Sequence, residues 1–156
     1  MTENELCGYV EQYRTMVFRL AFSYLNNSQD ADDVAQETFL KLYLSDEDFK
    51  SSENVKAWLI RVTINNSKNL LRSVWRKRRT DIDEDMKSES KEEYQLLSVI
   101  SRLKPDYRIV IHLFYYEDYS VKEISEILNI SSSAVRTRLT RARNQLKKML
   151  LKEGFN

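Results

Sequence analysis

The stretch SVKEISEILNISSSAVRTRLTRARNQL, residues 120–146, decides how the C-terminal part of the chain folds. It opens with Ser120 and Glu123 at the spacing of a capping box, in which the two side chains satisfy free amides at a helix start. A short apolar helix follows, and residues 129–131 form a turn whose asparagine can adopt a left-handed conformation. A longer helix then places Val135 and later apolar residues on one face. This order of elements predicts a helix-turn-helix.

The outer face of the long helix is polar and basic. Arginine can donate two hydrogen bonds to guanine in the major groove, short polar groups permit close approach, and further arginines suit phosphates. We therefore predict a recognition helix that binds DNA; the alternative is a solvated basic helix that only packs against its neighbours. The DNA-binding residues predicted on this face are Ser133, Arg136, Thr137, Thr140, Arg141 and Arg143.

The rest of the chain has the composition of a helical protein. Only two glycines and one proline occur in 156 residues, and helices avoid both residue types whereas turns between strands need them. Apolar residues recur at helical spacing through the N-terminal half and again before the helix-turn-helix, where residues 107–116 are strongly apolar. We expect an all-α fold. The helices predicted in the N-terminal half span residues 5–26, 29–44 and 53–78.

One segment interrupts the helical pattern. Residues 80–91, TDIDEDMKSESK, are acidic and contain no apolar stripe, which is typical of a flexible linker. We therefore predict two small helical domains, residues 1–79 and 92–156, joined by this linker. The charges favour the same division, since residues 61–80 contain seven bases and no acid, and residues 121–156 contain eight bases and three acids. Two separate basic blocks predict two contacts with polyanions.

At this point the sequence resembles a known family. Residues 120–146 are similar to the C-terminal DNA-binding region of extracytoplasmic-function (ECF) sigma factors, a compact group of the sigma-70 family of bacterial RNA polymerase. Residues 30–40, DADDVAQETFL, resemble the segment of these proteins that docks on the polymerase clamp helices. Residues 57–65, AWLIRVTIN, with the basic run that follows, resemble the segment that opens the −10 promoter element. The resemblance covers roughly residues 5–150 and implies a dissociable initiation factor.

The resemblance gives roles to residues in each half. Asp33, Gln36 and Glu37 share one helix face, away from the apolar stripe, and the implied partner of this acidic patch is core RNA polymerase. The C-terminal recognition helix would bind the −35 element of promoter DNA, and residues 46–54 would form a pocket for a flipped −10 base. The residues implied in −10 binding are Arg61, Asn65, Lys68, Arg72 and Arg76.

No pattern in the chain suggests catalysis, a metal site or a cofactor. The single cysteine, Cys7, and the single histidine, His112, are too few for a structural zinc, and His112 lies in an apolar helix where a core or partner-facing role is expected. Residues 1–5 lack the plan of a signal peptide and no apolar run could span a bilayer, so we expect a cytoplasmic protein without membrane insertion. The family resemblance also implies an anti-sigma factor as a partner.

Two alternatives stay open on the sequence. A conventional helix-turn-helix regulator would bind DNA without polymerase, usually as a dimer on two half-sites. A nucleic-acid-processing enzyme could use Asp33 and Glu37 to share a metal ion, although further ligands are not evident in the sequence.

Overall fold

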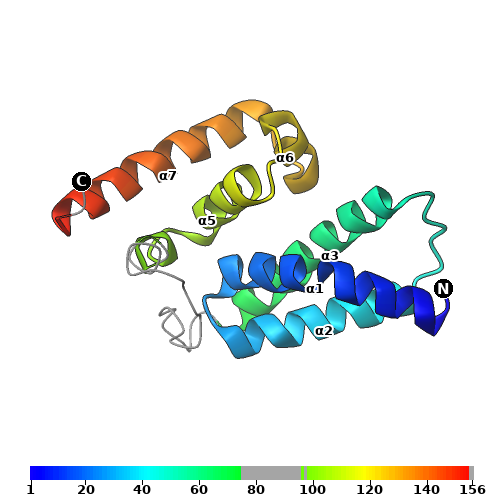
Figure 1. The fold of residues 1–156 in the computed structure, drawn as a ribbon. Helices are drawn as coiled ribbons and strands as arrows, with labels where there is room; N and C mark the ends of the chain where they lie inside the picture. Colours follow the sequence, from blue (N-terminus) through cyan, green and yellow to red (C-terminus); the bar gives the residue numbers. More distant parts are fainter. Residues whose placement is uncertain (75–95, 97, 155–156) are drawn as a thin grey trace. The chain divides into compact units, whose positions relative to one another are not determined.

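The computed structural model describes residues 1–74, 96 and 98–154 of the chain. The chain divides into two compact units, Met1–Arg79 and Thr80–Asn156 (Figure 1). Every regular element of the described residues is helical, which confirms the all-α prediction. The predicted linker at residues 80–91 and the predicted DNA-binding residue Arg76 lie outside the described residues.

Three helices that contact one another make the first unit: α1 (Glu3–Leu25), α2 (Ser28–Leu44) and α3 (Ser52–Val74). Their ends are set by local capping. Thr2 forms a capping box with Glu5 at the start of α1, and Asn26 ends that helix at φ 51°, in the left-handed region that asparagine tolerates. Asn27 then caps α2 by accepting a hydrogen bond from the amide of Asp30.

The core of this unit comes from all three helices. The buried side chains of its main cluster are Tyr13, Val17, Phe39, Leu42, Val55 and Leu59. Trp58 is partly buried against this cluster and meets Phe49, from the loop before α3, edge to face at 6.0 Å between ring centroids. The loop is thereby held against α3.

The second unit contains α5 (Pro105–Ile111), the π-helix η1 (His112–Tyr116), α6 (Val121–Leu128) and α7 (Ser132–Lys152). Pro105 occupies the first turn of α5, as its fixed φ and missing amide hydrogen favour. The predicted apolar helix at residues 107–116 is thus continuous but changes from α to π winding, and the amide of Glu117 donates to the carbonyl of His112 at 3.2 Å. Both α5 and α6 pack against α7.

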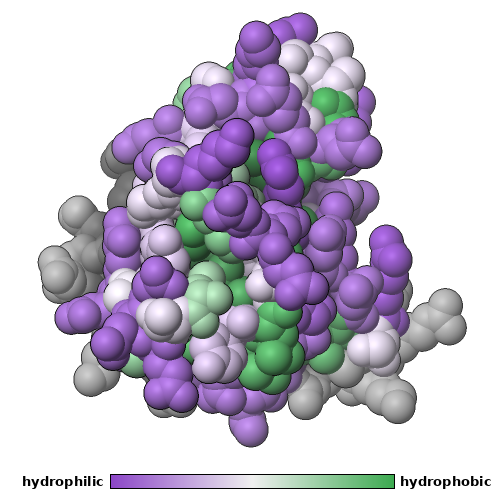
Figure 2. Space-filling model, turned by 90° about the vertical axis from the view of Figure 1, so that its right-hand side faces the viewer, coloured by the Kyte–Doolittle hydropathy of each residue, from purple (hydrophilic) through white to green (hydrophobic). Residues whose placement is uncertain are grey.

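A buried arginine supports this second unit. Arg108 is 3% exposed and its Nη1 donates to the carbonyl of Leu103, two residues after the helical residues 98–101. Such a contact satisfies a carbonyl that has no partner within a helix. Figure 2 shows one face of the molecule, most of which is covered by hydrophilic side chains.

Candidate nucleic-acid interface

The predicted helix-turn-helix is confirmed by the backbone and its caps. Ser120 Oγ accepts from the amide of Glu123 at 3.1 Å, and Glu123 Oε1 accepts from the amide of Ser120 at 3.0 Å. Asn129 adopts φ 55° at the end of α6. Ser131 caps α7 by accepting from the amide of Ala134 at 3.0 Å. Each junction of the motif therefore has a local cause in the sequence.

The two faces of α7 separate core residues from polar ones. Val135, Leu139 and Ala142 are buried against the rest of the unit. Every residue predicted to bind DNA is exposed on this helix and available to a ligand; the set is Ser133, Arg136, Thr137, Thr140, Arg141 and Arg143. This arrangement can place arginine and short hydroxyl side chains against a major groove.

Arg143 differs from the others because it has protein partners. Its Nε donates to Tyr115 Oη at 2.7 Å, and its guanidinium carbon lies 5.5 Å from the ring centroids of both Phe114 and Tyr115. Tyr115 is itself 51% exposed and was not singled out by the sequence analysis. The tyrosine lies in the apolar run before the helix-turn-helix, where the sequence pattern indicates only core packing.

The acidic patch on α2 is exposed as expected. Asp33, Gln36 and Glu37 all face solvent, and Glu37 Oε1 lies 3.3 Å from Lys41 Nζ. The structure adds an apolar component that sequence reasoning missed. The large hydrophobic side chains exposed near the C-terminal end of α2 are Leu40 at 56%, Tyr43 at 36% and Leu44 at 69%. The sequence pattern could have revealed this component, because Leu40 and Leu44 fall outside the buried apolar stripe of α2.

The residues expected to bind the −10 element follow one side of α3. Arg61, Asn65 and Arg72 are exposed and Lys68 is half-buried. Their spacing of four, three and four residues keeps them on a common side of the helix. A row of basic residues along one side of an α-helix is compatible with a DNA strand whose backbone lies along that side.

Asn65 and its neighbour Asn66 have opposite environments. Asn66 is 6% exposed, its Oδ1 accepts from Lys41 Nζ at 2.8 Å, and its Nδ2 donates to Thr38 Oγ1 at 3.3 Å. The buried amide therefore joins α2 to α3. Only Asn65 presents its side chain to an external ligand.

His112, for which a core or partner-facing role is expected, is buried. It is 7% exposed, its ring stacks on that of Tyr116 at 5.5 Å, and its Nε2 lies 3.5 Å from a carboxylate oxygen of Glu117. Within the described residues, no group of three or more His, Cys, Asp or Glu side chains is placed to hold a metal ion. Among those residues, Asp33 and Glu37 are therefore not joined by a third side chain of these four types.

Together, the helices and their exposed faces define a two-unit helical protein with a helix-turn-helix in its second unit. Comparison with known proteins agrees. Sigma-70 region 2 matches residues 9–77, and sigma-70, region 4 matches residues 93–146. RNA polymerase sigma factor SigV of Bacillus subtilis is 31% identical over 161 residues, covering 99% of this chain and 96% of the relative. ECF RNA polymerase sigma factor SigM of the same bacterium is 30% identical over 160 residues, covering 94% of each.

Solved structures share the fold. The sigma factor RpoE of Bartonella quintana, in complex with the anti-sigma factor NepR, gives a TM-score of 0.76 at 20% identity over 94% of this chain and 96% of that one. CnrH, in complex with the cytosolic domain of CnrY, gives 0.69 at 25% identity over 96% and 89%. The chain therefore belongs to the ECF sigma factors of the sigma-70 family and is an RNA polymerase sigma factor. The conventional helix-turn-helix regulator is not favoured by these matches.

Within residues 1–74, 96 and 98–154, none of the helices combines the length and the apolar content needed to cross a bilayer.

Proposed function

We propose that the two domains, residues 1–79 and 92–156, divide promoter recognition between them while core polymerase holds both. The observation that carries the proposal is the exposure of two distinct chemical faces. An acidic-amide face lies on α2, and a hydroxyl-arginine face lies on α7. The first suits a basic protein surface and the second suits DNA.

Docking on the polymerase clamp helices is assigned to Asp33, Gln36 and Glu37. Carboxylates steer association with a basic partner, and the amide can both donate and accept hydrogen bonds. The exposed Leu40 and Leu44 extend this face with apolar area. An interface with an apolar centre and a charged rim is the usual composition of specific protein contacts.

Binding and opening of the −10 element is assigned to α3. Its DNA-binding residues would be Arg61, Asn65, Lys68, Arg72 and Arg76, the last outside the described residues. An exposed amide such as that of Asn65 can read one edge of an unstacked base, while the cations neutralise the strand. Extrusion of a base costs a few kcal/mol, so contacts of both kinds are needed.

Binding of the −35 element is assigned to the exposed face of α7. Arginine gives bidentate contacts to guanine, and hydroxyl groups bond base edges or phosphates. The residues assigned are Ser133, Arg136, Thr137, Thr140, Arg141 and Arg143. Each of the two promoter contacts is small, so tight binding requires polymerase to hold both domains on the same DNA.

We also propose an anti-sigma factor as a regulatory partner and the cytoplasm as the site of action. Support for the partner comes from the relatives of known structure, since RpoE was solved with the anti-sigma factor NepR. The phosphodiester chemistry would belong to polymerase, and the chain itself would not be an enzyme. An inhibitor of this kind should abolish promoter-specific transcription when it is added before core polymerase.

Run-off transcription on a pool of bacterial promoter fragments tests the proposed function. Core polymerase is assayed alone, with the wild-type chain, and with Gln36→Ala. We expect discrete transcripts only when the wild-type chain is present, and a large loss with Gln36→Ala. Gln12→Ala, which alters an exposed glutamine on α1, is the matched control and should transcribe like wild type.

Two outcomes would contradict the assignments. Normal transcription by Gln36→Ala would remove the docking face on α2 from the mechanism. Tight, sequence-specific DNA binding by the free chain, without transcripts in the presence of polymerase, would restore the conventional regulator.

A further inference from the structure

The contact between Tyr115 and Arg143 joins two segments that lie 28 residues apart. Tyr115 belongs to η1 and Arg143 to the second half of α7. The hydrogen bond from Arg143 Nε to Tyr115 Oη measures 2.7 Å, within the normal range for this donor and acceptor. The rings of Phe114 and Tyr115 meet edge to face at 5.0 Å, and the guanidinium lies 5.5 Å from each ring centroid. The arginine is therefore held by a hydrogen bond and by two aromatic rings.

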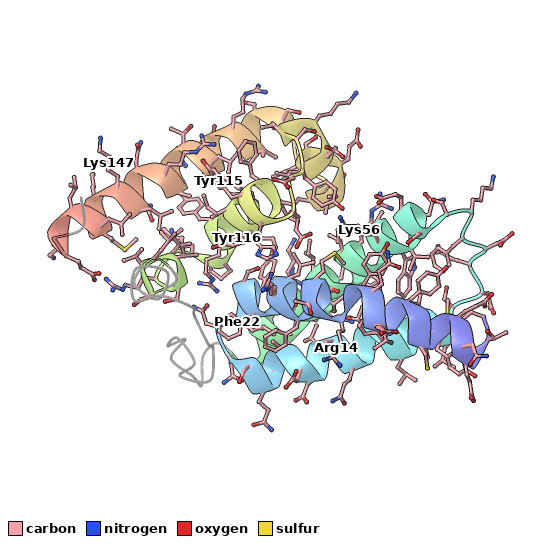
Figure 3. All side chains as sticks on the ribbon, viewed as in Figure 1. Arg14, Phe22, Lys56, Tyr115, Tyr116 and Lys147 are labelled. Carbon is pink, nitrogen blue, oxygen red and sulfur yellow. The ribbon has the colours of Figure 1, made fainter. Side chains whose placement is uncertain are left out.

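This contact does not belong to the core of the unit. Tyr115 is 51% exposed and Arg143 is also exposed, so neither is needed to fill the interior. A solvated tyrosine hydroxyl could bond water equally well, and a solvated arginine would normally be mobile on its long stem. Figure 3 shows Tyr115 labelled beside its neighbour Tyr116, whose ring instead stacks on His112. The two adjacent tyrosines thus have different partners.

The hydrogen bond leaves most of the guanidinium available. An arginine side chain has five N–H groups, and only the one on Nε is occupied by Tyr115. The two terminal NH2 groups of Arg143 take no part in the bond to Tyr115. Their four N–H groups form the fork that binds phosphate oxygens.

The position of Arg143 on α7 favours a phosphate over a base. Arg143 follows Arg136 by seven residues, so both lie on nearly the same side of the helix, about 10 Å apart along its axis. In a helix-turn-helix the N-terminal residues of the recognition helix reach the base edges. Residues two turns further along pass the edge of the groove, where the DNA backbone lies.

We propose that Tyr115 is a positioning residue that holds the Arg143 guanidinium ready for a DNA phosphate beside the −35 recognition helix. The inference rests on the proposed function, because it requires that α7 binds DNA. The gain comes from pre-organisation: rotamer freedom that a mobile arginine would lose on binding is already lost in the free protein. Arg143 supplies charge and therefore salt dependence, whereas Tyr115 supplies only orientation.

Fluorescence anisotropy with the full-length chain tests this division of roles. The probe is a labelled duplex of mixed sequence, about 25 base pairs long, titrated between about 50 and 200 mM KCl, because phosphate contacts depend on salt and not on sequence. Arg143→Ala should reduce the slope of log affinity against log salt by about one. Tyr115→Phe should weaken binding about two- to fivefold with the slope unchanged, because the released arginine would then lose its rotamer freedom only on binding.

A double-mutant cycle separates positioning from a structural role. In the Arg143→Ala background, Tyr115→Phe should cause no further loss, since the side chain that it orients is absent. Tyr116→Phe removes the neighbouring hydroxyl and is the matched control, expected to bind like wild type. An equal loss from Tyr115→Phe in both backgrounds would overturn the positioning role.

Arg136→Ala distinguishes failure of this inference from failure of the proposed function. If Arg136→Ala lowers the salt slope and Arg143→Ala does not, α7 binds DNA but Arg143 makes no phosphate contact, and the inference is refuted. If neither substitution alters binding, the proposed −35 site itself is wrong. Normal DNA binding by both Tyr115→Phe and Arg143→Ala, with loss of run-off transcription, would assign the pair to a protein surface and also refute the inference.

Discussion

Replacing Asn66 by alanine should destabilise the first unit without touching a proposed DNA contact. The substitution removes two hydrogen bonds, one from Lys41 Nζ at 2.8 Å and one to Thr38 Oγ1 at 3.3 Å. Each contributes about 1 kcal/mol net, and the partly filled space left behind adds up to about 1 kcal/mol. Thr38 keeps its bond to the carbonyl of Val34, and Lys41 is half exposed to water, so no buried group is left without a partner. The expected loss is therefore about 2–3 kcal/mol.

Urea unfolding followed by tryptophan fluorescence measures this loss in the right unit, because Trp58 and Trp75 both fall within Met1–Arg79. With a slope of about 1 kcal/mol per molar urea for a domain this small, the midpoint should fall by about 2–3 M. Asn65→Ala is the matched control: it alters an exposed amide one residue away and should shift stability by less than about 0.5 kcal/mol. Equal midpoints for the two variants would refute the reasoning.

Substitutions at three further positions probe the second unit. Ser120→Ala removes half of a capping box and should cost about 1 kcal/mol, seen as faster amide exchange in the first turn of α6; unchanged exchange there would contradict the cap. Asn129→Val places a β-branched residue at φ 55° and should lower the thermal midpoint of the unit. The stability of Asn129→Gly should stay within a few tenths of a kcal/mol of wild type, because glycine tolerates this conformation. Equal effects of the two substitutions would contradict a conformational cause. Arg108→Met leaves the carbonyl of Leu103 without its donor and should cost about 1–3 kcal/mol in calorimetry, and a midpoint like that of wild type would contradict this.

The fold was largely predictable because its signals are local. Asn27 and Ser120 start helices by accepting a hydrogen bond from the amide three residues on. Asn26 and Asn129 end helices in the left-handed conformation that asparagine tolerates, and all of these patterns are visible in the sequence. Apolar periodicity then indicates which face of each helix is buried. The π winding of residues 112–116 was not predictable, since the side chains of an apolar helix do not reveal whether an extra residue is included in one turn.

The helix faces of the candidate site were predictable from the sequence, but the contacts between its individual side chains were not. Periodicity separates the exposed face of α7 from its buried face, and all six predicted residues on that face are exposed. The two contacts that distinguish individual residues join positions far apart in sequence: Lys41 with Asn66 across 25 residues, and Tyr115 with Arg143 across 28. Such pairs depend on how helices pack, which a pattern within one helix does not contain.

The long-range contact of Lys41 affects how strongly individual charges on the proposed docking face attract a basic partner. Glu37 belongs to the proposed docking face, yet its partner Lys41 also bonds Asn66, so the cation is held in place by α3. The ion pair itself is worth little because both groups are about half exposed. Its position still matters, since a basic partner approaching Glu37 meets a fixed positive charge, whereas Asp33 has no such neighbour among its described contacts. Asp33 should therefore contribute more than Glu37 to the rate of association with polymerase at low salt, and Asp33→Asn should slow that association more than Glu37→Gln. Stopped-flow fluorescence with core polymerase measures these association rates. A larger slowing by Glu37→Gln than by Asp33→Asn would contradict the prediction and would indicate that Lys41 leaves Glu37 during docking.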